Sequence, residues 1–284
     1  MTTSTSPNHI RSPYQNDIAR YWNDEERPVN LRLGAVDGLY HHHYGVGDVN
    51  WSVLDAAAAD RDQAIIDELH RLETAQAELL IDSLGYVAPE ERILDAGCGR
   101  GGTSLLAHAR FGCHVDGVTL SSKQAAFANE QARLGGVADR VAFHTGNMLD
   151  TGFTQGAYQA AWNNESTMYV DLMDLFGAHA QLLKRGGRYV TVTGCYNEVY
   201  GQPSKAVSTI NAHYECNIHG RSEYFRAMAA NRLTPVEVRD LTPQTIPYWE
   251  LRAQSSVATG IEEAFLSSYR DGSFQYLLIA ADRI

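Results

Sequence analysis

The segment LDAGCGRGG, residues 94–102, decides the fold of this chain. It follows a short apolar strand and opens a helix, so it forms a strand-to-helix turn. Gly97, Gly99 and Gly101 lack a Cβ, which lets a ligand approach the main chain closely where backbone N–H groups converge. Asp95 places a carboxylate just before them. The turn therefore predicts a nucleotide-like ligand at the end of the first strand of an α/β sheet.

The glycine spacing distinguishes two kinds of loop. Dinucleotide-binding loops carry G-x-G-x-x-G, whose third glycine packs the helix against the strand. Here the spacing is G-x-G-x-G after an acidic residue, which resembles motif I of the S-adenosylmethionine (SAM) methyltransferases. The turn favours SAM over a dinucleotide, and Asp95, Gly97, Gly99 and Gly101 are predicted to bind this cofactor.

Composition narrows the class of protein. A chain of 284 residues with 44% hydrophobic content is long enough for one compact enzyme. A net charge of −11 argues against nucleic acid as a partner. No apolar run could span a bilayer or act as a signal peptide, so we expect no membrane association and a cytoplasmic location. Four cysteines without C-x-x-C spacing predict buried thiols rather than a metal or redox site.

The chain is predicted to have three parts. Residues 1–13 are expected to form a disordered polar tail, and residues 14–86 an N-terminal helical cap with a long amphipathic helix at 62–84. Residues 87–284 are expected to form the SAM-binding methyltransferase core. An irregular insertion at about 194–221 is the predicted substrate lid.

Strands and helices alternate through the core. Strands are expected at residues 92–95, 114–118, 141–145, 158–163, 187–193, 235–241 and 274–280. Helices are expected at residues 103–111, 121–134, 171–183 and 222–231 and across 245–268. Seven strands with the SAM loop after the first predict an α/β fold of the class I SAM-dependent methyltransferase type, a Rossmann-like sheet whose last strand is antiparallel.

The next two strand ends carry further cofactor motifs. Thr119, Leu120 and Gln124 follow the second strand, where a methyltransferase usually places an acid for the ribose hydroxyls. Their pattern, GVTLSxxQ, resembles cyclopropane synthases and sterol C-methyltransferases, in which hydroxyl and amide groups take that role. Asp116 is a possible acidic substitute.

The third strand ends in Asn147 and Met148, an amide and a thioether. We expect the amide to bind the adenine edge and the methionine to cover the ring, although core packing is the alternative for the methionine.

The fourth strand ends in WNNESTMY, residues 162–169, at the place where the methyl group leaves the cofactor. Glu165 is a carboxylate among aromatic residues and Met, and such a group is costly to bury unless a cation forms beside it. We interpret Glu165 as a general base. A helix N-cap or a ligand of the SAM ammonium group are the alternatives.

The segment RPVNLRLGAVDGLYHHHYG, residues 27–45, is the second unusual feature. Three adjacent histidines cannot all converge on one ion, so packing and hydrogen bonding are expected for them. The sequence His43-Tyr44-Gly45 is similar to the cap of cyclopropane synthases, which closes over cofactor and substrate.

Several long sequence motifs spread over the chain make the resemblance specific. The set VNLRLGxVDGLYHHHYG, VTLSxxQA, NMLD, WNNESTMYVDL, GQPSK, INAHxECNIH, PYWELRxxS and YRDGSFQYxLIAADR covers residues 14–284. It resembles the geranyl diphosphate 2-C-methyltransferases of actinomycetes, which serve 2-methylisoborneol biosynthesis.

That resemblance implies a reaction and roles for three residues. SAM methylates the alkene of geranyl diphosphate at carbon 2 to give 2-methylgeranyl diphosphate, with magnesium bound through the diphosphate and no direct protein ligand. The tertiary cation at carbon 3 needs aromatic faces and a nearby base. Glu165 matches the general base, Tyr214 the ring that stabilises the cation, and Tyr44 a tyrosine beside substrate and cofactor. The family also implies a homo-oligomer.

The substrate is expected to contact polar and aromatic groups at the pocket. The predicted substrate-binding residues are Asn30, Arg32, Tyr40, His42, Asn164, Tyr169, Tyr196, His219 and Trp249. Further candidates for the diphosphate are Gln202, Lys205, His213 and Arg252.

Two departures from the family keep other acceptors open. The geranyl enzymes tend to carry Phe at the position of Tyr214 and Trp at that of Tyr196, and a phenol at 214 shortens the pocket unless its hydroxyl finds a partner. Isopentenyl diphosphate, a five-carbon unit, is therefore the alternative acceptor. Small-molecule O- or N-methylation is a more distant alternative.

Overall fold

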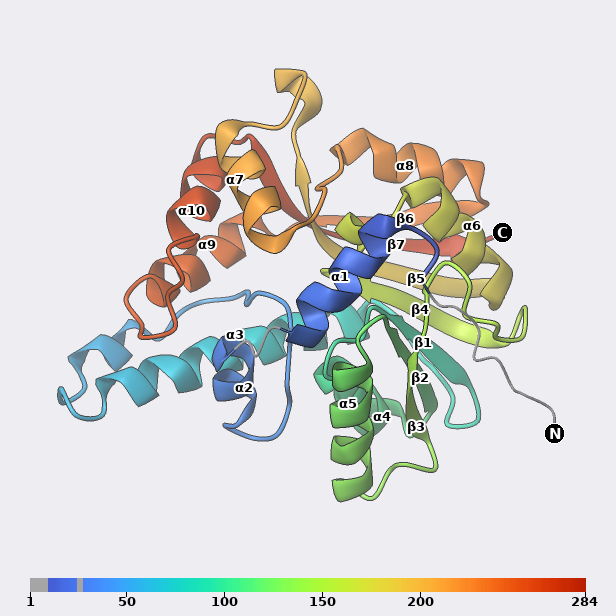
Figure 1. Cartoon of the computed structure of the whole chain (residues 1–284), viewed down its shortest axis with the longest axis horizontal. Coiled ribbons are helices and arrows are strands. Elements are labelled where there is room, and N and C mark those ends of the chain that lie inside the picture. The colour runs from blue at the N-terminus through green and yellow to red at the C-terminus, as the bar shows by residue number, and fades with distance from the viewer. Residues whose placement is uncertain (1–9, 25–27) are drawn as a thin grey trace.

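A seven-stranded sheet forms the centre of the computed structural model, which describes residues 10–24 and 28–284. The strands are β1 (Arg92–Ala96), β2 (His114–Thr119), β3 (Val141–Thr145), β4 (Tyr158–Asn164), β5 (Leu183–Tyr196), β6 (Leu233–Asp240) and β7 (Phe274–Arg283). They lie in the order β3-β2-β1-β4-β5-β7-β6 (Figure 1). The last strand, β7, runs antiparallel to both of its neighbours. The predicted class I methyltransferase fold is confirmed.

The helices surround this sheet. They are α1 (Pro13–Asp24), α2 (Pro28–Gly34), α3 (Arg61–Asp82), α4 (Gly102–Phe111), α5 (Ser122–Leu134), α6 (Leu172–Leu182), α7 (Lys205–Tyr214), α8 (Arg221–Ala230), α9 (Thr242–Arg252) and α10 (Glu262–Arg270). Short 3-10 turns cover η1 (Trp51–Asp55), η2 (Thr167–Tyr169) and η3 (Glu198–Tyr200).

Two local expectations differ from the structure. The insertion at 194–221 is not irregular throughout, because Ser204 caps the helix α7 by accepting a hydrogen bond from the backbone N–H of Val207. The helical region expected across 245–268 is two helices, α9 and α10. They are separated by a turn that contains Gly260, whose φ of +86° falls outside the helical range.

The core has two layers, one on each face of the sheet. Helices α3, α4, α5, α9 and α10 pack on one face, and α6 and α8 pack on the other. Along β5, Val190 and Val192 face the first layer and Tyr189 faces the second, as the alternation of side chains in a strand requires. The apolar side of α3 lies inside the first layer, so it is buried within this chain.

Helix α1 crosses the edge of the sheet where the parallel strands end (Figure 1). The tail predicted for residues 1–13 falls mostly outside the described residues. The part that is described leads into α1 at Pro13, and Arg11 forms an ion pair with Asp150.

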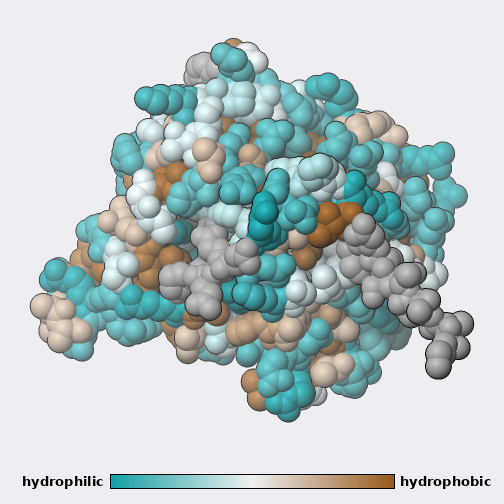
Figure 2. All heavy atoms as spheres, viewed as in Figure 1, coloured by the Kyte–Doolittle hydropathy of each residue, from teal (hydrophilic) through white to brown (hydrophobic). Residues whose placement is uncertain are grey.

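The surface in Figure 2 is mostly hydrophilic, with scattered hydrophobic residues. Over residues 10–24 and 28–284, the helices are too short or too polar to cross a membrane.

Candidate active site

The loop after β1 has the backbone geometry that only glycine adopts easily. Gly97 and Gly101 have φ values of +88° and +84°. A Cβ at Gly97 would lie 2.4 Å from the Cβ of Ser166, and one at Gly101 would lie 2.4 Å from the ring of Phe143. The loop therefore packs directly against the ends of its neighbours and leaves its main chain open toward a cavity.

This first cavity, the cofactor cavity, has a volume of about 70 Å³. Of the residues predicted to bind SAM, those that line it are Gly97, Gly99, Thr119, Leu120, Gln124, Asn147 and Met148. The strand ends therefore bring together motifs that are far apart in sequence.

Asp95 and Gly101 lie behind the cavity wall rather than in it. The Asp95 carboxylate is buried and accepts a hydrogen bond of 2.7 Å from the Ser104 hydroxyl, and burial raises its pKa to about 7. Gly101 has no Cβ, which leaves room for the ring of Phe143 beside it. Both residues support the loop, with no contact to the cavity.

The end of β2 and the start of α5 bring a hydroxyl and an amide to the cofactor cavity. The Thr119 hydroxyl donates to Gln124 Oε1 over 2.8 Å, and both residues line the cofactor cavity. Asp116 does not replace the missing acid. Its carboxylate pairs with Arg92 at 2.7 Å and accepts from the Tyr158 hydroxyl at 2.9 Å, and it lies outside the cavity lining.

Helix α1 supplies cofactor-cavity residues that sequence reasoning missed. Gln15, Ile18 and Trp22 line the cavity, and the Asn147 side-chain amide donates to Gln15 Oε1 over 2.9 Å. The same helix reaches the insertion, because the Tyr21 hydroxyl donates to the backbone carbonyl of His213 over 3.2 Å. These residues belong to the predicted cap, but nothing in their pattern indicates contact with the cofactor.

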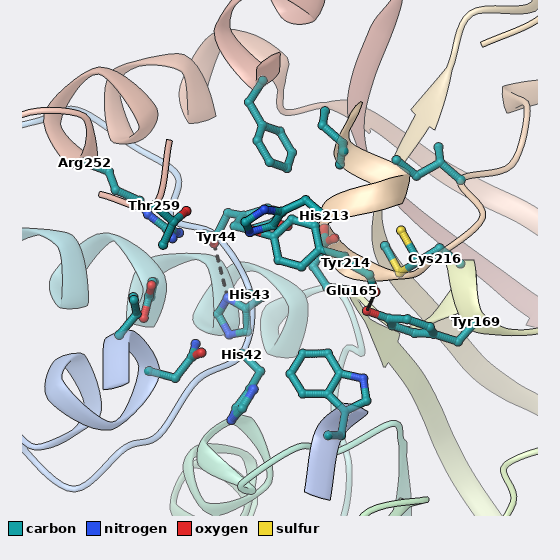
Figure 3. Close-up of a pocket in the computed structure, with 18 of the residues that line it drawn as sticks. His42, His43, Tyr44, Glu165, Tyr169, His213, Tyr214, Cys216, Arg252 and Thr259 are labelled. Carbon is teal, nitrogen blue, oxygen red and sulfur yellow. Dashed lines mark hydrogen bonds between the residues drawn. The ribbon is translucent and has the colours of Figure 1, made fainter. Parts of the chain in front are cut away.

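The second cavity, the acceptor cavity, has a volume of about 210 Å³. Trp22, His42, Glu165 and Tyr169 line both cavities, so the two share a wall. In Figure 3, Arg252 and Thr259 lie on one side of the acceptor cavity, opposite Tyr169. The acceptor cavity thus has a polar side, and it meets the cofactor cavity at Glu165.

Glu165 has the properties expected of a general base. It follows β4 with a φ of +51°, and its N–H bonds to the Val192 carbonyl over 3.0 Å. Burial raises the pKa of its carboxyl to about 8, against a smaller opposite effect of the nearby Tyr276 hydroxyl. Its Oε1 is buried without a hydrogen-bond partner. A group in this state accepts a proton readily near neutral pH.

Aromatic rings surround one part of the acceptor cavity. The Tyr44 ring centroid lies 4.6 Å from that of Trp249, 5.1 Å from that of Phe265 and 6.4 Å from that of Tyr214. Trp249 itself does not line the cavity, because it is fully buried and stacks on Phe265 at 3.9 Å. Burial raises the pKa of the Tyr44 hydroxyl and the neighbouring Tyr214 side chain raises it further, so the extra phenol at 214 lies beside another phenol.

The polar side holds a buried charged group. Arg252 lines the cavity, is 6% exposed and pairs with Glu262, with 3.2 Å between Nε and Oε1. Glu73 lines the cavity too. Its carboxyl accepts a hydrogen bond of 2.8 Å from the Tyr248 hydroxyl, and burial raises its pKa to about 8. Asn30, a predicted substrate residue, completes this side.

The three adjacent histidines point in different directions. His42 lines both cavities and His43 lines the acceptor cavity, whereas His41 lines neither. The His41 ring is tilted against His43 at a centroid distance of 4.8 Å and stacks on His70 at 5.6 Å. Burial lowers the pKa of His43 to about 4, so this ring is neutral at pH 7. No cluster of three metal-ligating side chains occurs in the described part of the chain.

Several other predicted substrate residues lie outside the acceptor cavity. Arg32 pairs with Asp62 at the surface, and Tyr40 packs its ring against Phe127. Tyr196 ends β5, where its N–H bonds to the His219 carbonyl. These three residues therefore contact other parts of the protein and do not line the acceptor cavity.

The remaining candidates divide in the same way. The His219 ring bonds to backbone carbonyls of the η2 turn, and Gln202 and Lys205 line a separate surface groove. His213 lines the acceptor cavity and Asn164 the cofactor cavity.

Comparison with known proteins supports one enzyme class. The family model described as a methyltransferase domain matches residues 93–187. The chain is 67% identical over 273 residues to the geranyl diphosphate 2-C-methyltransferase of Saccharopolyspora erythraea, covering 96% of each chain. It is 62% identical over 287 residues to that of Streptomyces coelicolor, covering 100% of this chain and 98% of the other.

A solved structure agrees with these relatives. The geranyl diphosphate C-methyltransferase from Streptomyces coelicolor A3(2), in complex with Mg2+, geranyl-S-thiolodiphosphate and S-adenosyl-L-homocysteine, superposes with a TM-score of 0.94 at 64% identity. The match covers 96% of this chain and 99% of that one.

Proposed function

The chain belongs to the geranyl diphosphate 2-C-methyltransferases, and on that premise we propose how its own residues carry out SAM-dependent methylation of geranyl diphosphate at carbon 2. The observation that carries this proposal is the position of Glu165 in the wall shared by the two cavities. A base at that wall faces the carbon that receives the methyl group.

The cofactor cavity is the SAM site. SAM supplies an electrophilic methyl group when bound. Gly97 and Gly99 leave the main chain open toward it, Thr119 and Gln124 bind the ribose, and Asn147 and Met148 bind the adenine. Helix α1, through Trp22, covers this site and excludes water from it.

The acceptor cavity holds the prenyl chain against aromatic rings. Methylation at carbon 2 leaves a tertiary cation at carbon 3, which the faces of Tyr44 and Tyr214 stabilise. Glu165 then removes the proton from the methylated carbon, which restores the alkene. The buried and unpartnered Oε1 of Glu165 is the oxygen suited to this step.

Geranyl diphosphate is favoured over the isopentenyl alternative. The relatives and the solved structure that match over nearly the whole chain are geranyl enzymes. One reason for the alternative is also weakened, because the Tyr214 side chain lies beside the Tyr44 phenol and the polar His213, and its surroundings are not purely apolar.

The diphosphate belongs on the polar side of the acceptor cavity. Arg252, Asn30 and His42 are the groups there that suit its oxygens, and Mg2+ enters with it. The solved relative holds Mg2+ together with a geranyl diphosphate analogue.

We further propose that residues 14–86 act as the cap, that the segment 194–221 acts as the substrate lid, and that the enzyme is a cytoplasmic homo-oligomer that binds neither nucleic acid nor membranes. Light scattering on the purified protein tests the oligomeric state.

The direct test of function is incubation of the purified protein with SAM, Mg2+ and one of four acceptors: isopentenyl, dimethylallyl, geranyl or farnesyl diphosphate. Mass spectrometry should show one methyl group added to geranyl diphosphate. A product from isopentenyl diphosphate alone would replace geranyl by the five-carbon acceptor, and no product from any of the four would overturn the proposal.

A further inference from the structure

A buried phenol lies behind the wall that carries Glu165. Tyr276, on β7, is fully buried and lines neither cavity. Its hydroxyl accepts a hydrogen bond of 3.2 Å from the side-chain amide of Gln76. A hydroxyl that accepts a hydrogen bond still has its own proton to donate. Tyr276 therefore needs an acceptor on its other side.

Two amides fix the position of this phenol relative to the base. Gln76, on α3, is fully buried, and its Nε2 donates both to Asn164 Oδ1 over 2.7 Å and to the Tyr276 hydroxyl. Asn164 Nδ2 donates back to Gln76 Oε1 over 2.9 Å. Both N–H groups of the Gln76 amide are thereby used, which sets its orientation. Because Asn164 directly precedes Glu165, the amide pair ties Tyr276 to the strand end that carries the base.

The group on which the Tyr276 hydroxyl acts is the Glu165 carboxyl. It lowers the pKa of Glu165 against the larger effect of burial. Burial, and next the neighbouring Glu165, raise the pKa of Tyr276 well above its ordinary value, so the phenol keeps its proton. Since Glu165 Oε1 has no hydrogen-bond partner, a hydroxyl on the other oxygen leaves Oε1 to take the substrate proton.

Four more groups interact electrostatically with Glu165 from other segments of the chain. Burial raises the pKa of each of them, so they are protonated and uncharged at neutral pH. They are Tyr44, Cys216, Tyr224 and Tyr269.

A second carboxyl of the acceptor cavity has a similar pKa. Burial raises the pKa of Glu73 to about 8, but its hydroxyl partner is Tyr248. A change at Tyr276 therefore separates the titration of Glu165 from that of Glu73. The other ionisable side chains that line the two cavities are His42, His43, Tyr169, His213, Tyr214 and Arg252.

We propose that Tyr276 is a positioning residue for the general base: its hydroxyl, oriented by Gln76, donates to the ionised Glu165 carboxylate and stabilises it, and Oε1 stays available for the proton of the methylated carbon. This inference rests on the proposed function. The side-chain amide of Gln76 does not ionise and so passes no proton on. Tyr276 is thus a donor to the base and not a step in a proton relay.

The first test is the pH profile of kcat/KM for Tyr276→Phe between pH 6 and pH 10, with saturating Mg2+. A hydrogen bond that favours the ionised carboxylate lowers its pKa, so losing that bond should move the acidic limb upward by about one pH unit. Activity should therefore fall about tenfold at pH 7 and mostly return by pH 10. An equal loss at every pH, or a wild-type profile, would overturn the proposal.

Tyr158→Phe is the matched control. Tyr158 is also a buried tyrosine of the sheet, and its hydroxyl donates to Asp116 over 2.9 Å outside both cavities. This variant loses a buried hydroxyl too, but its acidic limb should stay at the wild-type pH. A shift equal to that of Tyr276→Phe would show a general effect of removing a buried phenol and would overturn the assignment.

A second measurement is independent of turnover and keeps the shape of the side chain. Infrared spectroscopy of the S-adenosylhomocysteine complex follows the C=O band of protonated Glu165, identified by its absence in Glu165→Gln. When 3-fluorotyrosine replaces Tyr276, the more acidic phenol donates more strongly, and the band should disappear at lower pH than in wild type. An unchanged titration overturns the proposal even if Tyr276→Phe fails to fold. Because this titration needs no acceptor, wild-type enzyme that fails to methylate geranyl diphosphate would overturn the proposed function separately.

Discussion

The rings of Trp22 and Tyr169 meet edge to face, with their centroids 6.2 Å apart. Both residues line the cofactor cavity and the acceptor cavity. Trp22 comes from α1 and Tyr169 from the η2 turn after β4. This contact therefore joins the helix that lines the cofactor cavity to a turn that lines both cavities.

Trp22→Ala should open this contact. We expect kcat/KM to fall about a hundredfold, because the methyl group and the alkene lose their alignment. Water admitted to the site should also capture part of the cation, giving a hydrated, methylated product that mass spectrometry detects. Trp22→Phe keeps an aromatic edge and serves as the control. Unchanged kinetics with no hydrated product in Trp22→Ala would contradict a covering role for α1.

The pH dependence of the reaction should report Glu165. Only the ionised carboxylate accepts a proton, and burial raises its pKa to about 8. We therefore expect kcat/KM to fall by about tenfold per pH unit below this value. The measurement is a pH profile with saturating Mg2+. A profile that stays flat down to pH 6 would exclude Glu165 as the titrating base.

The same carboxyl should lower stability at high pH. Its folded pKa of about 8 exceeds its ordinary value of 4.5, so its favourable contribution is complete below 4.5 and is lost as pH rises from there to about 8. Glu165→Gln avoids this loss. The variant should be more stable than wild type at pH 8, by about 1.4 kcal/mol for each pKa unit of the shift.

Denaturant unfolding at pH 5 and pH 8 checks this expectation. The two proteins should differ little at pH 5. The variant should also retain SAM binding while losing turnover. If the difference in stability between wild type and variant is the same at pH 5 and pH 8, the pKa of the carboxyl is not raised in the folded protein.

His219 should act on the turn and not on the substrate. Its Nε2 bonds to the backbone carbonyls of Thr167 and Val170 over 3.2 and 2.9 Å. His219→Ala should lower kcat by about tenfold, since the turn that carries Tyr169 loses its support, with little change in SAM affinity. His219→Gln keeps a donor and should recover part of the rate. A large rise in KM for geranyl diphosphate with unchanged kcat would instead indicate a substrate contact.

Tyr214→Phe should leave the preferred chain length unchanged. The aromatic ring proposed to face the cation is kept, and the lost hydroxyl lies beside the Tyr44 phenol. Competition between geranyl and isopentenyl diphosphate is the measurement. A marked gain for the longer substrate would show that the hydroxyl limits pocket depth.

The fold could be predicted because its signals are local. The glycine turn, the alternation of strands and helices and the motifs at each strand end lie within short segments, and the parallel sheet brings those ends to one edge. Seven of the nine predicted cofactor residues line the cofactor cavity for this reason. Asp95 and Gly101 do not, because sequence alone did not separate a residue that faces the ligand from one that supports the loop.

The rest of the site depends on long-range packing. Gln15 meets Asn147 across 132 positions of sequence, and Tyr248 meets Glu73 across 175. No local pattern shows which polar group of a helix will face a cavity once such contacts form. For the same reason Arg32 and Tyr40, which lie in a segment that resembles a cap, have partners outside both cavities that the motif did not indicate.

The backbone at Glu165 has a consequence for anyone who engineers this enzyme. A residue other than glycine with a φ of +51° costs about 1 kcal/mol or more. Glycine at 165 would relieve that cost, asparagine would lower it, and either would remove a buried acid as well. A library selected for heat tolerance alone would therefore enrich inactive proteins at this position, so screening must include turnover from the first round.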